Sequence, residues 1–378
     1  MKFALVVALA ALPSLAQQKP LMSEDVFKNV QVLRGIPVNQ FMDTMGFFAS
    51  SLGYNCTNCH GDEVLGNWAK YAVDTPVKVT ARRMLGIVST INKSAFGGRE
   101  VVTCFTCHRG GPAPRSVPSL LEQYSEPAPD DPNDVQLSRR NPNPGPSADQ
   151  MLDRYLEALG GEQKLAALAS FSGKGKYEGF DSYHGKVAME IYAKASGPRT
   201  VIAHAPNGDS ITAFDGTNAW IMGVDKPVSV LQLVPGGDLD GVKLDSALAF
   251  PVKLKSALTE WRTGFPTTLI NDRPVDVVQA LAGQSRVKLF FDKQTGLLTR
   301  MVRFSKTMVG LVPTQVDYSD YREVAGVKLP FEWHLTWTYG QSIFTLDSAE
   351  PNVTIDAAKF ARPAAAVKPV VAPAAVTQ

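Results

Sequence analysis

The sequence predicts two domains of different fold class: a small all-α domain, followed by an antiparallel sheet with a covering helix. Three observations support this division. Between residues 20 and 118 the apolar residues recur at helical spacing, and alternating strand patterns are scarce. From residue 110 to 146 the chain is rich in proline and polar residues, a composition that cannot build a core. Beyond Phe171 the apolar residues alternate with a period of two, which is typical of strands.

Length and charge exclude several classes of protein. The 378 residues include 38 Lys and Arg against 36 Asp and Glu, a formal net charge of +2, with no long basic run. Because binding to phosphates needs a concentrated positive surface, we expect no nucleic-acid partner. After the N-terminus, no apolar stretch reaches the roughly 18 to 20 residues that span a bilayer. We therefore expect a soluble or peripherally attached protein.

The first 16 residues have the form of a secretory signal peptide. Lys2 is followed by the apolar run Phe3–Leu12 and then by Ser14-Leu15-Ala16, so cleavage is expected after Ala16. A buried N-terminal helix is the alternative interpretation. No Cys lies near the cleavage site, which argues against a lipid-anchored lipoprotein. We expect the mature chain in the periplasm or another extracytoplasmic compartment.

All four cysteines fall in two copies of the pattern C-x-x-C-H. The copies are Cys56-Thr57-Asn58-Cys59-His60 and Cys104-Phe105-Thr106-Cys107-His108. In this pattern two thiols a turn apart add to the vinyl groups of one porphyrin, and the following His binds the iron. A single copy would also fit a redox dithiol or half of a zinc site, and four Cys in an exported chain ordinarily suggest two disulfides. Two identical copies predict two covalently attached c-type haems.

The sixth ligand of each iron decides between electron transfer and ligand chemistry, because an open position admits oxygen or peroxide. Two expected helices, over residues 38–52 and 75–92, carry methionine. The first has Met42 and Met45 three residues apart, and the second has Met84 within an apolar stripe. From the pattern alone, a Met on an apolar helix face more often fills a core than binds iron.

Arg82 and Arg83 precede Met84 on the second of these helices. They could pair with haem propionates, or they could form a solvated basic face.

This part of the chain resembles half of the tetrahaem cytochrome subunit of photosynthetic reaction centres. The resemblance implies that Met45 is the axial partner of the haem on His60, and that Met84 is that of the haem on His108. Met42 is then a packing residue. The resemblance extends over about residues 26–118, roughly a quarter of the chain. The family has four haems, whereas this sequence has motifs for two. The matching segments are Asn29–Leu33, Phe41–Met45, Ala81–Leu85 and Val102–Gly110.

The expected divisions of the chain follow from these patterns. We expect a signal peptide (1–16), a dihaem cytochrome c domain (17–118), a Pro-rich linker (119–146), a β-domain (147–361) and a disordered tail (362–378).

Within the β-domain, helices are expected over 150–159, after a cap at Ser147, over 162–168, and over 239–263. Strands separated by turn signals predict hairpins in sequence and a curved antiparallel sheet, with the third helix across its concave face. The expected strands cover residues 173–180, 186–193, 200–204, 210–214, 219–222, 286–292, 298–305, 315–324, 328–339 and 342–346.

The β-domain resembles, more loosely, the half-barrel of the LolA and LolB lipoprotein-carrier families. The features that carry the likeness are Gly160-Gly161 after the entry helix, the segment 168–175, the turn within 291–297 and the hairpin within 318–329. The resemblance implies a concave face that shelters a lipid or another apolar ligand. The alternative is a closed scaffold whose inner face is only its core.

The β-domain shows no catalytic constellation, because His184, His204 and His334 are scattered over separate segments. The leading hypothesis is therefore an electron carrier rather than an enzyme: an exported dihaem cytochrome that passes single electrons between redox protein partners, with the β-domain docking or binding an apolar group. The alternatives are a haem peroxidase-like enzyme with one open iron site, and a lipid or lipoprotein carrier with accessory haems.

Overall fold

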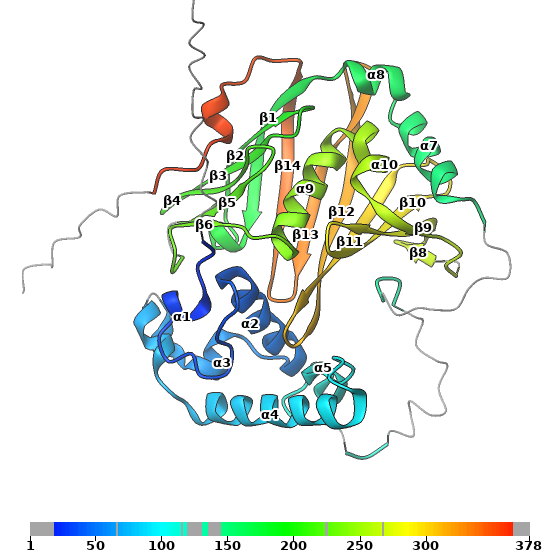
Figure 1. Cartoon of the computed structure of the whole chain (residues 1–378). Helices are drawn as coiled ribbons and strands as arrows, with labels where there is room; N and C mark the ends of the chain where they lie inside the picture. The colour runs from blue at the N-terminus through cyan, green and yellow to red at the C-terminus, as the bar shows by residue number, and fades with distance from the viewer. Residues whose placement is uncertain are drawn as a thin grey trace, which may run out of the picture.

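The computed structural model describes residues 19–65, 67–114, 116–118, 131–134, 145–223, 226–266 and 268–365. A helical part, residues 19–118, lies at one end of a large curved sheet, and further helices cover the concave face of that sheet (Figure 1). The predicted fold class, a helical domain followed by an antiparallel sheet, is confirmed. The expected signal peptide lies outside the described residues. Within them, no helix combines the length and the apolar character that crossing a bilayer requires.

Two helices with well-defined ends organise the helical part. α2 covers Val38–Leu52, the predicted range, and closes at Gly53 in the left-handed conformation, with φ of 64°. α4 covers Pro76–Phe96, where the Thr75 hydroxyl accepts the N–H of Lys78, and it runs past the predicted end at residue 92. The shorter elements of this part are α1 (Ser23–Val26), α3 (Cys56–His60), η1 (Asp62–Val64), η2 (Trp68–Ala72) and α5 (Cys104–His108).

One antiparallel sheet dominates the rest of the chain. Its order in the described residues is β6-β5-β4-β3-β2-β1-β14-β13-β12-β11-β10-β9-β7, with β8 paired to β9. Most neighbours are sequential hairpins, and β1 pairs with β14 in the middle of the order. The strands are β1 (Ser170–Gly179), β2 (Lys186–Lys194), β3 (Arg199–Ala205), β4 (Gly208–Phe214), β5 (Ala219–Met222), β6 (Val230–Gln232), β7 (Thr259–Arg262), β8 (Thr268–Ile270), β9 (Arg273–Ala282), β10 (Ser285–Asp292), β11 (Leu298–Thr307), β12 (Gly310–Val324), β13 (Val327–Trp337) and β14 (Gly340–Pro351).

All ten expected strands are present, but β6, β7, β8 and β9 are not foreseen by the sequence pattern. β9 is the longest of the four, and it is apolar on both faces. Val275 and Val277 pack in a cluster on one face, whereas Val278, Ala280 and Ala282 join the main core on the other. A strand that is buried on both sides lacks the apolar-polar alternation that marks a half-exposed strand.

The helix expected over residues 239–263 is wrong at its C-terminal end. α9 covers Gly237–Ala249 and stops at Phe250, before Pro251 begins the turn η4 (Pro251–Lys253). Proline lacks the N–H that a helix interior needs and clashes with the preceding turn, so the helix cannot continue. α10 (Leu254–Ala257) and β7 take up the remainder of the expected range.

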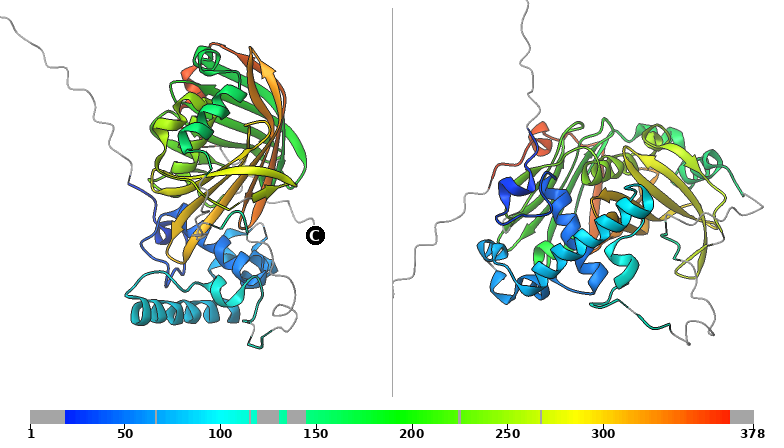
Figure 2. Two further views of the ribbon diagram at one scale, coloured as in Figure 1. Left: turned by 90° about the vertical axis from the view of Figure 1, so that its right-hand side faces the viewer. Right: turned by 60° about the horizontal axis from the view of Figure 1, so that its bottom comes forward.

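The main core lies between the concave face of the sheet and the helices that cover it (Figure 2). α7 (Ala148–Ala158), capped by Ser147 as expected, contributes Leu152 and Tyr155, and α8 (Glu162–Ala167) contributes Leu165. The strands contribute fully buried side chains such as Leu289 and Met301. The C-terminal turn η5 (Ala357–Phe360) precedes residues 362–365, which have no helix or strand, and the rest of the expected tail lies outside the described residues.

The short described piece of the expected linker, residues 131–134, lies against the outer face of the sheet. Lys288 on β10 is only 1% exposed and donates from Nζ to the carbonyl of Pro132 at 3.2 Å and that of Asp134 at 2.5 Å. Asn133 Nδ2 donates to Gln315 Oε1 at 2.7 Å. This piece is therefore fixed to the sheet.

The helical part docks on the sheet through α2. Phe47 packs with Val309 and Val312 of the β11–β12 hairpin, and Gln40 Nε2 donates to the carbonyl of Lys306 at 3.1 Å. Gly46 faces Tyr339 at the β13–β14 turn, where a Cβ would overlap the tyrosine ring. The two parts therefore meet through apolar packing that requires glycine on α2.

We expect Gly46→Ala to separate α2 from the β13–β14 turn, because the added methyl has no room beside Tyr339. Small-angle scattering should then show a larger radius of gyration, and protease should cut between the two parts more readily. Gly86→Ala on α4 is the matched control, since nothing lies within 4 Å of a Cβ there. It should leave the shape unchanged and stabilise the helix by about 0.5–1 kcal/mol. Equal behaviour of the two variants would contradict the docking described above.

Lys288 should give the protein a pH-dependent stability. Burial lowers the pKa of Lys288 to about 8, against the opposing effect of the carboxyls of Asp134 and Asp131. In the unfolded chain the pKa returns to about 10.4. Between about pH 8 and 10 the unfolded state therefore binds a proton that the folded state does not, and the free energy of unfolding rises with pH.

Lys288→Met should lose this rise, whereas Lys243→Met, which removes an exposed lysine of α9, should keep it. Denaturant unfolding followed by far-UV circular dichroism across this pH range makes the comparison. The same pH slope in the wild type and in Lys288→Met would show that Lys288 is not responsible.

Candidate functional site

The two C-x-x-C-H segments form two helices of the same construction. Each covers the five residues of its motif and begins after a capping side chain: Asn55 accepts from the N–H of Asn58 at 3.1 Å, and Thr103 accepts from that of Thr106 at 3.3 Å. A capped helix start places residues three and four apart on one face. Both cysteines and the histidine of each motif therefore share a helix face.

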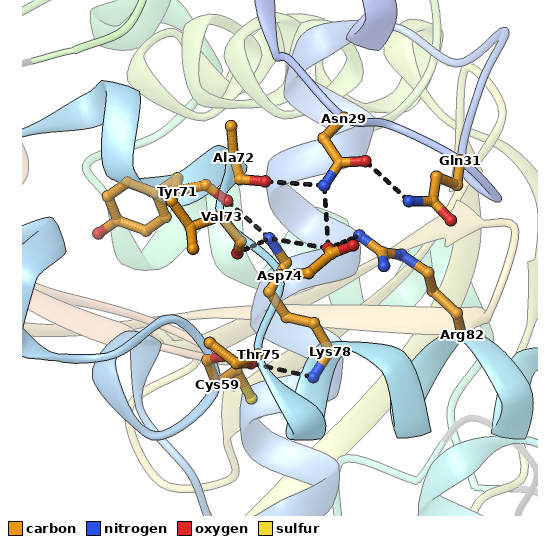
Figure 3. A network of polar contacts seen from close by, with 10 residues as sticks. All are labelled: Asn29, Gln31, Cys59, Tyr71, Ala72, Val73, Asp74, Thr75, Lys78 and Arg82. Carbon is orange, nitrogen blue, oxygen red and sulfur yellow. Dashed lines mark hydrogen bonds and ion pairs between the residues drawn. The ribbon is translucent and has the colours of Figure 1, made fainter.

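The first motif helix is tied to the start of α4. The Thr75 hydroxyl donates to the carbonyl of Cys59 at 2.6 Å while it caps α4. Close by, Lys78 Nζ donates to the carbonyls of Tyr71 and Val73 at 2.8 and 2.7 Å, and burial lowers the pKa of Lys78 (Figure 3). These contacts fix the chain that follows His60 against α4.

Asp74 is the centre of the same polar network. Arg82 Nη2 pairs with Asp74 Oδ1 at 2.7 Å, and Asn29 Nδ2 donates to that oxygen at 2.9 Å (Figure 3). The Arg82 hydrogen bond lowers the pKa of Asp74, so the pair is ionic at neutral pH. Arg82 thus has a partner within the chain, whereas Arg83 is exposed.

His60 lies half-buried at the end of the first motif helix. Its ring centroid is 4.8 Å from that of Tyr71, and its Nδ1 is buried without a hydrogen-bond partner of ordinary geometry among the described residues. Burial, together with the charge of Lys78, lowers the pKa of His60, and the Tyr71 backbone carbonyl opposes this in part. His60 is therefore a neutral imidazole near pH 7, the form that binds a metal ion.

His108 is oriented by its own chain. Its Nδ1 lies 3.1 Å from the carbonyl of Gly111, so Nδ1 donates and Nε2 remains as the acceptor. The turn after His108 is packed on α2, where the N–H of Gly110 donates to the carbonyl of Ser51 at 2.9 Å. A Cβ on Gly53 would overlap the carbonyl of Gly110, so the close approach requires glycine at the end of α2.

The four thiols, all within the described residues, form no disulfide. Burial raises the pKa of Cys59 and Cys104. The described residues also hold no group of three or more Cys, His, Asp or Glu side chains arranged for a metal ion. The two cysteines and the histidine of each motif suit thioether formation with a porphyrin and ligation of its iron by His.

Met45 lies on α2 and Met84 lies on α4, the two helices that the pattern predicts. Each of these helices contacts the motif helix of the other repeat: α2 packs on α5, and α4 packs on α3. Met84 is 41% exposed and shares one face of α4 with Ile87 and Ile91, which are also exposed. Only Asn92 of this 21-residue helix is buried. A helix that exposes a stripe of large apolar side chains has a surface suited to a flat apolar group such as a porphyrin.

The donor set and its surroundings fit the predicted group. Two histidines have a nitrogen free for iron, four thiols are unpaired, and α4 exposes a stripe of large apolar side chains.

Comparison with known proteins finds similarity for this part of the chain. Residues 4–143 match the family model described as photosynthetic reaction centre cytochrome C subunit. The helical part is similar to reaction centre cytochromes. It is 39% identical over 109 residues to the subunit of Thermochromatium tepidum, covering 28% of this chain and 26% of that protein. It is 33% identical over 99 residues to the subunit of Rubrivivax gelatinosus, covering 25% of each. The chain thus spans about a quarter of the length of these relatives.

Two solved structures align with the sheet part of the chain. One is a LolA superfamily protein from Nitrosomonas europaea, with 13% identity, a TM-score of 0.40, and coverage of 57% of this chain and 98% of that chain. The other is a DUF1329 family protein from Desulfovibrio piger, with 10% identity, a TM-score of 0.41, and coverage of 56% and 96%.

Asn92 positions the second motif, although the sequence pattern does not single it out. Its side chain donates to the carbonyl of Val102 at 2.8 Å and accepts the N–H groups of Val101 and Val102 at 3.2 and 2.9 Å. This ties the loop before Cys104 to α4. The one signal in the sequence is a polar residue next to the apolar Ile91 near the end of a helix, which is too common to be diagnostic.

Asn92→Ala should free this loop, because three hydrogen bonds are lost together. We expect the amide of Val102 to exchange with deuterium roughly ten- to a hundredfold faster, the equivalent of about 1–3 kcal/mol. The amide of Val101 should change less, because it also donates to the carbonyl of Arg99. Ser94→Ala is the control, since that hydroxyl only contacts the carbonyl of Ile91 within its own helix. Unchanged exchange in Asn92→Ala would remove Asn92 from the positioning role.

Proposed function

We propose that this protein is an exported dihaem c-type cytochrome that transfers single electrons between redox partner proteins. The observation that supports it most strongly is the pair of equivalent motif helices, each with two unpaired thiols and a histidine on one face. In the proposal, Cys56 and Cys59 hold one haem by thioether bonds, and Cys104 and Cys107 hold the other. His60 and His108 are the proximal ligands.

When bound, each haem supplies an iron that cycles reversibly between two oxidation states. The chain's own part is to hold the ligands in place. The carbonyl of Gly111 keeps His108 in the tautomer with a free Nε2, and Thr75 joins the first motif helix to α4. Rigid ligands favour electron transfer, because little has to move when the charge on the site changes.

The sixth ligands in the proposal are Met45 for the haem on His60 and Met84 for that on His108. Leu85, the neighbour of Met84 on α4, packs against the same apolar cluster as Cys104, which supports the second assignment. With Met and His as axial ligands, both sites should have high reduction potentials. A filled sixth position also disfavours the peroxidase-like alternative, which needs an iron open to peroxide.

The partners in this proposal are redox proteins of an extracytoplasmic compartment, and export rests on the signal-like residues 1–16. The domain limits at residues 118, 146 and 361 remain part of the proposal.

Sheltering of a lipid by the concave face of the sheet has less support, because Leu289, Met301 and Val278 on that face are already buried against the covering helices. Docking is the role of the sheet that we favour.

Replacing the axial methionines tests the function. Met45→Ala and Met84→Ala should each remove about half of the near-infrared absorption of Met-ligated ferric haem and lower one of two midpoint potentials. The thioethers should still retain the porphyrin. Met42→Ala is the matched control on α2 and should change neither property. If Met42→Ala lost the band and Met45→Ala kept it, Met42 rather than Met45 would be the sixth ligand of the haem on His60. A high-spin iron in the wild type would favour the peroxidase-like enzyme.

A further inference from the structure

The turn between β11 and β12, residues Thr307–Gly310, projects from the sheet into the helical part. The Thr307 hydroxyl donates to the carbonyl of Gly310 at 2.8 Å and accepts the N–H of Val309 at 3.3 Å, and Thr307 is itself buried. Gly310 has a φ of 138°, which side chains rarely adopt. These contacts give the turn one rigid shape, which we call the hairpin tip.

The hairpin tip reaches the second C-x-x-C-H motif. A Cβ on Gly310 would lie 3.1 Å from Phe47 Cζ and 3.1 Å from Cγ2 of Thr103, the residue that caps α5. Val309 belongs to the same apolar cluster as Phe47, and Cys104 packs against that cluster. The first cysteine of the second motif therefore packs against a cluster to which the C-terminal sheet contributes Val309 and Val312.

A cavity of about 420 Å³ opens beside these contacts. Cys104, Val102 and Leu85 line it from the helical part, and Met308 and Val309 line it from the hairpin tip. Met308 is 49% exposed, so its side chain is free to face whatever occupies the space next to Cys104. The charged groups on the cavity wall are Arg82, Lys93 and Glu100.

We infer that the hairpin tip forms one wall of the second haem site, with Met308 beside the porphyrin edge that is joined to Cys104. The inference rests on the proposed function, since it needs a haem on this motif. A thioether bond places a porphyrin carbon directly on the Cys104 sulfur, so the residues packed on Cys104 lie beside that edge. The C-terminal sheet then sets the solvation and charge of this haem, which are two of the factors that tune a reduction potential.

A charge at position 308 tests this directly. Oxidised haem carries one more positive charge than reduced haem, so a nearby cation raises the midpoint potential and a nearby anion lowers it. Met308→Lys should raise, and Met308→Glu should lower, the midpoint potential of the haem on His108. The haem on His60 should move less in both variants. A general loosening of the fold would instead shift the potential in the same direction for both substitutions.

The potentials are measured by spectroelectrochemical titration of the purified holoprotein. The titration wave that Met84→Ala lowers is assigned to the haem on His108, and the other wave is assigned to the haem on His60. Leu269→Lys and Leu269→Glu are the matched controls, because Leu269 is a 57% exposed apolar residue on β8, at another edge of the sheet. These two Leu269 variants should leave both midpoint potentials unchanged.

Opposite shifts of the Met84-linked wave, absent from the Leu269 variants, support the inference. Unmoved waves in both Met308 variants, or a shift confined to the Met45-linked wave, overturn it. Failure of the proposed function looks different, because the wild type would then show no haem waves at all.

Discussion

The helical part buries few of its own residues, so its arrangement depends on contacts other than a core of its own. The motif helices α3 and α5 bury no residue, and α4 buries one. A helix of five residues is unstable in isolation, because too few hydrogen bonds form to offset the ordering of the chain. Capping side chains and the contacts of Thr75 and Asn92 therefore fix the motifs locally, and an apolar group against α4 would supply the burial that the chain lacks.

The sheet provides the large buried core that the helical part lacks. Its concave face carries a large core with the covering helices, and its β11–β12 and β13–β14 turns receive α2. This contact is closely fitted, since a Cβ at Gly46 would overlap Tyr339 and a Cβ at Gly310 would lie only 3.1 Å from Phe47. The helical part therefore packs against a rigid sheet. In this arrangement the β11–β12 turn of the sheet lies next to the second motif.

Much of this could be predicted from the sequence, for physical reasons that differ between elements. α2 has its predicted limits because a helical apolar pattern ends at a glycine that can adopt a left-handed conformation. Hairpin strands such as β2 were predictable because one face carries the polar residues Lys186, Glu190 and Lys194 while the other packs in the core, and a turn signal follows the strand. β9 was not predictable, since burial on both faces erases the alternation. The docking of α2 was also not predictable, because it depends on the fit between residues almost three hundred positions apart.

The central claim is that two porphyrins are joined to the chain through its four cysteines. The most direct measurement is the intact mass of the mature polypeptide, purified from a host that can attach c-type haem, before and after digestion into peptides. The account predicts the mass of two haem groups, one on the peptide containing Cys56 and Cys59 and one on the peptide containing Cys104 and Cys107. A chain without added mass, or one whose cysteines are joined to each other, would contradict it.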